Sequence, residues 1–165
     1  MNVTVARTSN DGRFVGPASP LADVSREHWD KFCRLLEVQS TNKISESGGF
    51  GSYAIRPRRL VELGYAMYLR SKRTDKGRTI QTCEFLPPWT QAKFFKDPLA
   101  QYVAFSRSML LYYTAMASGE LKRPAGVSLA GALAILHCGG KGALKAWPEI
   151  FSDTKVLYDR VQGLF

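Results

Sequence analysis

Polar side chains that can transfer protons or form hydrogen bonds are concentrated in one segment of the chain. Glu37 precedes the amide of Gln39 and the hydroxyl of Ser40, and Glu46 and Tyr53 follow them. A carboxylic acid can protonate a leaving group, and a glutamine amide both donates and accepts hydrogen bonds. The alternative to these roles is that both carboxylates are solvated surface groups, Gln39 a satisfied amide at a helix end and Tyr53 a core tyrosine.

The first element that must position these residues is a helix. Ser25 is a suitable N-cap, and the apolar spacing predicts a helix from there through Ser40. Gln39 continues the apolar face of this helix, whereas Glu37 lies about 200° away from Gln39 around the axis. The other members of that face are Trp29, Phe32, Cys33 and Leu36.

Three further segments follow before the middle of the chain. Residues 41–53 are rich in glycine and small polar residues, which predicts a short hairpin or loop. Pro57 can begin a helix, with an apolar side that extends to Tyr68, and the basic run 70–78 is expected to be a solvated loop. The two prolines in residues 85–89 predict a rigid connector.

The second half of the chain is predicted to be helical. A long helix is expected from Asp97 or Pro98 to about Ala117, and Ser128 caps an apolar helix that should be central. Gly139 and Gly140 should break that helix, a short helix over 142–147 follows, and the last spans 154–164. The expected fold is therefore mostly α, with at most a small β-hairpin.

Length and composition restrict the possibilities further. A chain of 165 residues with 45% hydrophobic residues fits one globular domain. Residues 1–24, rich in Gly, Pro, Ser, Asn and Asp, are expected to form an extended N-terminal arm, and residues 25–165 the helical domain. Three cysteines without ligand spacing predict neither a disulfide framework nor a metal site, and no cofactor is expected.

The net charge of +9 points to an anionic partner, which can be nucleic acid, an anionic cell-envelope polymer or an acidic protein surface. Arg56, Arg58 and Arg59 are candidates for such contacts, since arginine binds phosphate or carboxylate with two hydrogen bonds. The alternative is a solvated helix face. No nucleic-acid motif occurs, and neither a signal peptide nor a membrane span is apparent.

Three segments, in this order, resemble the lysozyme superfamily, in particular phage-associated muramidases and lytic transglycosylases. In that family a helix ends in Glu-Ser-x-Asn, and a Gly-x-Tyr-Gln segment follows a hairpin. The corresponding residues here are Gln39-Ser40-Thr41-Asn42 and Gly51-Ser52-Tyr53-Ala54. Residues 94–101 and 128–140 are similar to the family's later helix-opening and small-residue segments.

This resemblance implies a lysozyme-like fold that acts on peptidoglycan through one glutamic acid. Gln39 occupies the position of that acid, and an amide cannot donate the required proton. Glu37 and Glu46 are therefore the remaining candidates for the catalytic acid. Gln39, Ser40, Tyr53 and His137 are then candidates for glycan binding, with a hydrogen-bonded core histidine as the alternative for His137. Ala54 lacks the amide that the family has at its position.

Two functional hypotheses follow from the resemblance. The first is a phage-associated enzyme that cleaves peptidoglycan during entry or lysis, with glycan strands and other virion proteins as partners. The second is an inactive lysozyme-like component of a virion or tail, which holds its neighbours through the basic surface and the N-terminal arm. Both place the protein in a virion, or in the host cytoplasm before assembly or lysis. An unrelated helical protein that binds nucleic acid or another partner is the third possibility.

Overall fold

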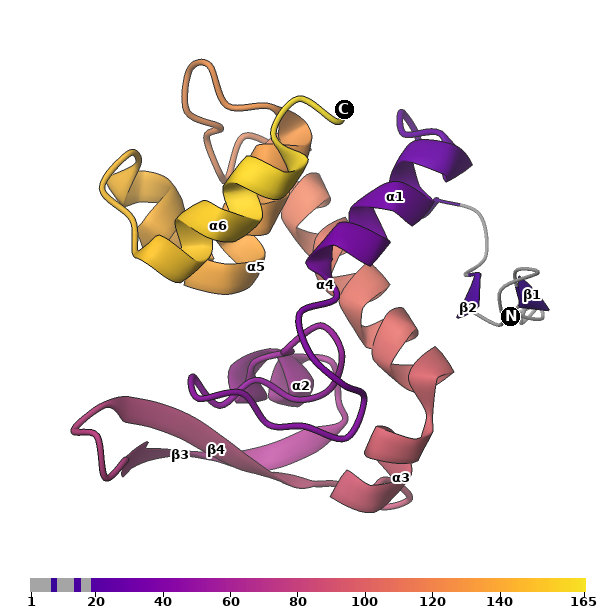
Figure 1. Ribbon diagram of the computed structural model, residues 1–165, viewed down its shortest axis with the longest axis vertical. Helices are drawn as coiled ribbons and strands as arrows, with labels where there is room; N and C mark the ends of the chain where they lie inside the picture. Colours follow the sequence, from indigo (N-terminus) through magenta and orange to yellow (C-terminus); the bar gives the residue numbers. More distant parts are fainter. Residues whose placement is uncertain (1–6, 9–13, 16–18) are drawn as a thin grey trace. The chain divides into compact units, whose positions relative to one another are not determined.

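The computed structural model describes residues 7–8, 14–15 and 19–165, and these residues form two compact units (Figure 1). The first unit contains residues 19–36 and Ser108–Phe165, and the second contains residues 7–8, 14–15 and Glu37–Arg107. Helix α4 (Pro98–Ala117) contributes residues to both. Helices predominate in the described residues, so the expected mostly helical class with a small hairpin is confirmed in this coarse form.

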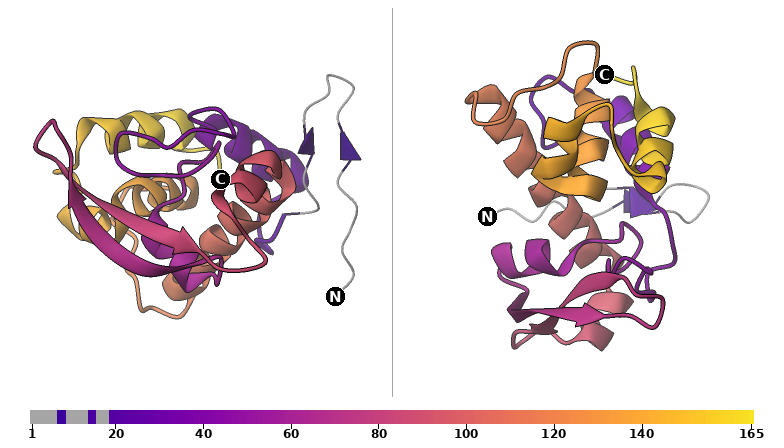
Figure 2. Two further views of the ribbon diagram at one scale, coloured as in Figure 1. Left: turned by 90° about the horizontal axis from the view of Figure 1, so that it is seen from below. Right: turned by 90° about the vertical axis from the view of Figure 1, so that its left-hand side faces the viewer.

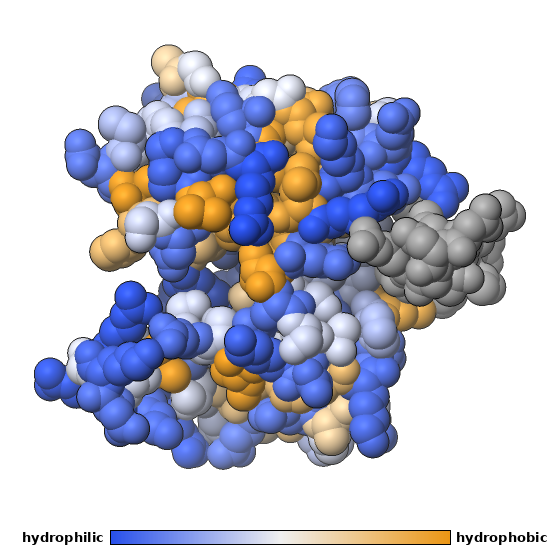
Figure 3. Space-filling model, viewed as in Figure 1, coloured by the Kyte–Doolittle hydropathy of each residue, from blue (hydrophilic) through white to orange (hydrophobic). Residues whose placement is uncertain are grey.

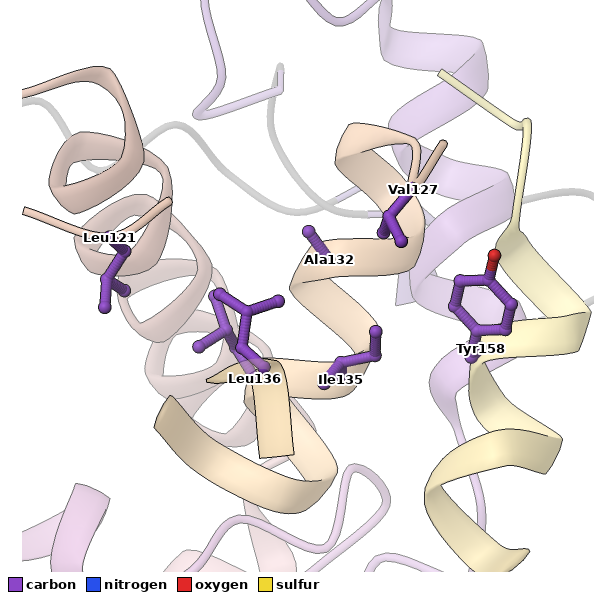
Figure 4. Close-up of a cluster of buried hydrophobic side chains, with 7 residues drawn as sticks. Leu121, Val127, Ala132, Ile135, Leu136 and Tyr158 are labelled. Atoms are coloured by element: carbon purple, nitrogen blue, oxygen red, sulfur yellow. The ribbon is translucent and has the colours of Figure 1, made fainter. Parts of the chain in front are cut away.

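The first unit is built from helices. Besides the second half of α4, it contains α1 (Arg26–Leu36), α5 (Leu129–Ala146) and α6 (Ser152–Val161), and α6 packs against α5. Figure 4 shows part of its core, to which α5, α6 and the segment before α5 contribute side chains. The buried members of this cluster are Leu121, Val127, Ala132, Ile135, Leu136, Leu144 and Tyr158.

Helix α5 is central to this unit, as its apolar sequence predicts. The Ser128 hydroxyl accepts a hydrogen bond from the Gly131 amide at 3.1 Å and caps the first turn. Residues 130–136 are all buried. The predicted break is confirmed at Gly140, where a φ of 73° kinks the helix before its last turns.

Gly131 marks a close approach of α5 and α6. A Cβ atom at this position would lie 2.8 Å from Cε2 of Tyr158 and would overlap Oε1 of Gln162. That oxygen accepts hydrogen bonds from the Ser128 amide and hydroxyl, at 3.1 and 3.0 Å. Because Gly131 has no side chain, α6 can pack closely against α5, and Gln162 can bind the N-terminus of α5.

The second unit is a mixed structure. It contains α2 (Pro57–Glu62), β3 (Ala66–Arg73), β4 (Thr79–Phe85), α3 (Gln91–Lys96) and the first half of α4. β3 and β4 pair antiparallel, with Ala66 opposite Phe85 and Arg73 opposite Thr79, in a twisted ribbon (Figure 2). The fully buried ring of Phe94 contacts three other aromatic rings in this unit, those of Tyr65, Phe85 and Trp89.

The helix predicted from Pro57 to Tyr68 is wrong in its second half. The Tyr65 amide donates to the Leu60 carbonyl and the Gly64 amide to that of Val61, at 2.9 and 3.1 Å. With Gly64 at a φ of 83°, these bonds form the common glycine-terminated helix end. The chain then enters β3, so residues 70–73 of the run predicted to be a loop lie in a strand and residues 74–78 form the turn of a hairpin.

Helix α1 also ends earlier than predicted, at Leu36 and not at Ser40. The amides of Val38 and Gln39 donate to the carbonyl of Ser52, at 2.8 and 3.4 Å, and not to the preceding turn. Gln39 therefore does not continue the apolar face of α1. A tertiary hydrogen bond decides this boundary, and the periodicity of the sequence contains no sign of it.

Much of the predicted N-terminal arm lies outside the described residues. Within it, β1 (Arg7–Thr8) pairs antiparallel with β2 (Phe14–Val15). Leu21 and Val24 are 1% and 6% exposed, so the chain already contributes to a hydrophobic core before residue 25. No helix in the described part of the chain is long and apolar enough to cross a membrane.

We expect Gly131→Ala to lower the free energy of unfolding by about 1–3 kcal/mol, because the new methyl group overlaps α6. Gly142→Ala is the matched control: nothing lies within 4 Å of its Cβ position, and a helical Gly→Ala change stabilises by up to about 1 kcal/mol. Urea unfolding followed by circular dichroism measures both. Equal stability of the two variants would contradict the close approach of α5 and α6.

Candidate functional site

The site residues singled out in the sequence lie mainly in the segment 37–55 of the second unit, here called the site loop. Phe50 forms isolated antiparallel bridges with Ile44 and with Ile55. The amide of Ser45 donates to Gly49, and that of Gly51 to Lys43, at 2.8 and 2.9 Å. The loop is thus a compact turn structure in place of a regular hairpin.

The side-chain amide of Gln39 holds the interior of this loop. Its Nε2 lies 3.0, 3.1 and 2.8 Å from the carbonyl oxygens of Lys43, Gly49 and Gly51. A primary amide has two hydrogens, so these acceptors use its whole donor capacity. Only the side-chain carbonyl oxygen of Gln39 is then left for the glycan binding expected of this residue.

A second amide, from α4, supports the same loop. Oε1 of Gln101 accepts from the amide of Ser52 at 2.9 Å and from its hydroxyl at 3.3 Å. Its Nε2 donates to the carbonyls of Thr41 and Phe94, both at 2.9 Å. Gln101 is only 1% exposed. Gly51 passes so close to this amide, with a φ of 72°, that a Cβ atom there would overlap Oε1.

Sequence reasoning did not assign a role to Gln101, although it lies in one of the three segments that carry the resemblance. The signal was a polar residue at a position flanked by apolar helix residues, Ala100 and Tyr102, both buried. A buried glutamine needs partners for both its oxygen and its nitrogen. Which partners it has depends on a segment about fifty residues earlier, which the local pattern does not reveal.

The structure brings Glu37 and Tyr53 together. The Tyr53 hydroxyl donates to Oε1 of Glu37 at 3.2 Å. The ring of Tyr53, 4% exposed, stacks on Phe105 with 4.2 Å between centroids and 13° between planes. Glu37 itself is exposed, directly after the end of α1. The result is an accessible carboxylate contacted by a tyrosine whose own position is rigid.

Glu46 is in a different environment. Its carboxylate is exposed and forms an ion pair with Lys76. The Nζ atom of Lys76 donates a hydrogen bond to it at 2.8 Å. That hydrogen bond and the charge of Lys76 hold the pKa of Glu46 below its ordinary value. A general acid requires the opposite shift, since it must carry a proton near neutral pH. The geometry therefore does not support Glu46 as the acid.

The remaining candidates are distributed over both units. Ser40 is exposed in the site loop, where its carbonyl accepts the Lys43 amide at 3.3 Å. His137 is half-buried on α5, in the first unit, and so is not part of the site loop.

The three arginines predicted to bind an anion lie at the start of α2. Arg56 is its N-cap residue, Arg58 is exposed, and Arg59 forms an ion pair with Glu62 at 2.7 Å. Ala54, half-buried with a φ of 48°, donates its amide to Gly51. Among the described residues, no three His, Cys, Asp or Glu side chains are grouped so that they can hold a metal ion.

We expect Gln101→Leu to lower the free energy of unfolding by about 2–5 kcal/mol, because it leaves the Ser52 amide and the carbonyls of Thr41 and Phe94 without their partner. Ser106→Ala on the same helix is the control. The Ser106 hydroxyl is buried and has no hydrogen-bond partner among the described residues, so its loss should cost less than about 0.5 kcal/mol. Chemical denaturation measures both. Similar values for the two variants would show that the Gln101 bonds contribute nothing.

Lys76→Met should raise the pKa of Glu46 towards its ordinary value, because it removes the largest cause of the downward shift. Lys72→Met is the control, since Lys72 is another hairpin cation and does not act on Glu46. A carboxyl ¹³C NMR titration measures both pKa values. An unchanged Glu46 pKa in Lys76→Met would contradict the ion pair.

The side-chain amides of Gln39 and Gln101 therefore support the site loop, and the loop presents the exposed carboxylate of Glu37, which the Tyr53 hydroxyl contacts. No family model, curated protein sequence or solved structure matches the chain. The function of the site is accordingly inferred from the chemistry of its own residues.

Proposed function

We propose that the protein is a lysozyme-like, phage-associated enzyme that cleaves bacterial peptidoglycan, with Glu37 as the catalytic acid. The observation that carries this proposal is the hydrogen bond from Tyr53 to Glu37, at 3.2 Å, beside a compact glycine-rich loop. Of the two carboxylates singled out in the sequence, only Glu37 is accessible without an ion pair to a described residue. It also lies two residues before Gln39, where the segment that resembles the family's active site begins.

The chemistry requires Glu37 to protonate the glycosidic oxygen as the bond breaks. The carboxylate is exposed in the protein alone, and a sugar bound over it would exclude water from one side. The Tyr53 hydroxyl would orient the carboxyl group, and the stacked Phe105 ring would limit the movement of Tyr53.

In lytic transglycosylases the same glutamate then acts as a base, assisted by the N-acetyl group of the substrate. A single carboxylate is sufficient for that mechanism, which agrees with the environment of Glu46. The ion pair with Lys76 makes Glu46 unsuitable as a second catalytic carboxylate. We therefore prefer the one-glutamate mechanism to a mechanism with two carboxylates.

The second candidate function is an inactive lysozyme-like component of a virion or tail that binds glycan or neighbouring subunits. One observation favours it: the residue at the family's acid position, Gln39, is committed to three backbone carbonyls and so stabilises the loop. A loop rigidified in this way can be retained for binding after catalysis is lost. The basic surface would then supply contacts to anionic neighbours.

Glu37→Gln should reduce the release of glycan fragments from purified sacculi by about 10²- to 10⁴-fold, because the amide has no proton to donate. Tyr53→Phe should cause a smaller loss, of about tenfold, since it removes only the group that orients the carboxyl. Glu46→Gln is the matched control and should keep the activity of the unmodified protein. Chromatography of the released muropeptides measures all three rates and also identifies anhydro products, which the transglycosylase mechanism predicts.

Two outcomes would redirect the assignment. Activity that survives in Glu37→Gln but is lost in Glu46→Gln would transfer the acid role to Glu46. No fragment release from several wall types, with sacculus binding that is equal in the unmodified protein and in Glu37→Gln, would favour the inactive component.

A further inference from the structure

A second feature of the molecule is the concentration of positive charge on the β3–β4 hairpin, residues 66–85, here called the basic hairpin. It carries two carboxylates, Asp75 and Glu84, and five cationic side chains. The cations are Arg70, Lys72, Arg73, Lys76 and Arg78. On the face of the molecule in Figure 3, hydrophilic residues cover the end of this hairpin. Residues 70–73 and 75–79 are exposed.

The register of the strands distributes these cations over both faces of the ribbon. Residues directly opposite each other in an antiparallel pair share a face, and successive residues alternate. Arg70 lies opposite Thr82 and Lys72 opposite Ile80, so these two cations share one face. Arg73, opposite Thr79, is on the other face. Arg70 and Lys72 therefore share the face of Ile80, which the site loop approaches at Gly48, where a Cβ atom would lie 3.5 Å from Cβ of Ile80, and Arg73 is on the opposite face.

The basic hairpin is closed at both ends by hydrogen bonds of its own backbone. At its base, the amide of Leu86 donates to the carbonyl of Tyr65 at 2.9 Å. At its turn, the amide of Thr74 donates to Arg78 at 2.7 Å, and Lys76 is bound to Glu46 in the site loop. A ribbon ordered in this way loses little conformational entropy when it binds a partner.

Several of its cations are available to an external anion. Lys72 and Arg73 form no ion pair with a described residue. Arg70 pairs with Glu84 only at 3.7 Å, with both side chains more than 60% exposed, and lies 5.7 Å from the centre of the Tyr68 ring. Exposed pairs of this kind contribute at most about 1 kcal/mol. A phosphate can therefore displace Glu84 at little cost.

The shape of the charge distribution favours one type of anion. The exposed cations lie along a narrow two-stranded ribbon, and duplex DNA carries its phosphates in two rows with a groove between them. The major groove of B-DNA is about 12 Å wide and accommodates a two-stranded β-ribbon between two rows of phosphates. We propose that the basic hairpin binds duplex DNA by inserting into the major groove, with Arg70, Lys72 and Arg73 on the phosphates.

The test measures binding of the full-length protein to a fluorescent duplex oligonucleotide by anisotropy, between about 50 and 200 mM salt. The hairpin variant carries Arg70→Gln, Lys72→Gln and Arg73→Gln. The control variant carries Lys122→Gln, Arg123→Gln and Lys145→Gln, three exposed cations of the first unit. Both variants lower the net charge from +9 to +6. Any difference between them therefore reports on position and not on total charge.

The unmodified protein should bind with an affinity that falls steeply with salt. The hairpin variant should bind at least about tenfold more weakly, and its slope of log K against log salt should be smaller by about 2.7, or about 0.9 for each lost phosphate contact. The control variant should lose less than about threefold. Glu37→Gln should bind DNA like the unmodified protein, so this proposal and the proposed glycan cleavage succeed or fail separately.

Three outcomes would overturn the proposal. The first is no binding to DNA at the lowest salt, and the second is an equal loss of affinity in the two triple variants. The third is that the hairpin substitutions weaken binding to purified anionic wall polymer but leave binding to DNA unchanged. Because the six substituted side chains are exposed, both variants should fold. Circular dichroism verifies this. A second comparison uses single changes: Arg73→Glu should lower the affinity for DNA more than Lys122→Glu does.

Discussion

The second unit depends on the hydrogen bonding of the backbone of the site loop. Segments without regular secondary structure leave carbonyl and amide groups unpaired, and burying such groups is costly. Two side-chain amides satisfy them here: Gln39 from within the loop and Gln101 from α4. Gly51 follows from the same constraint, since the backbone there passes too close to Gln101 for a side chain.

The position of the candidate acid is a consequence of this loop. The carbonyl of Ser52 accepts the amide of Val38, which ends the helical path and leaves Glu37 exposed at its margin. One residue further along the loop, Tyr53 contacts that carboxylate. The resemblance to lysozymes directs attention to Gln39, whereas the geometry favours Glu37. Under the proposed function, the amide of Gln39 supports the loop and the carboxylate of Glu37 is presented beside it.

Local signals were enough to predict much of the fold. Pro98 and Ala117 bound α4 as expected, Ser128 caps α5, and Gly140 interrupts it. Each of these boundaries is a property of a few adjacent residues. The hairpin 66–85 was missed because the apolar residues around Leu60 continue to Tyr68 at a spacing that also suits a helix. Gly64 was the available signal, since the helix end that forms there uses a left-handed residue. In the site, Glu37 and Tyr53 were identified from sequence, but the partners of Gln39, Gln101 and Glu46 were not.

The sequence by itself determined a mostly helical chain, its strong positive charge and the set of polar residues from which a site can be built. These properties depend on composition and on short-range periodicity. Tertiary structure decided which of those residues act together: it joined Glu37 to Tyr53, paired Glu46 with Lys76, and placed cations on both faces of a ribbon. The physical reason is that a hydrogen bond or ion pair forms between groups that are close in space, and residues 16 or 30 positions apart come together only when the intervening chain folds.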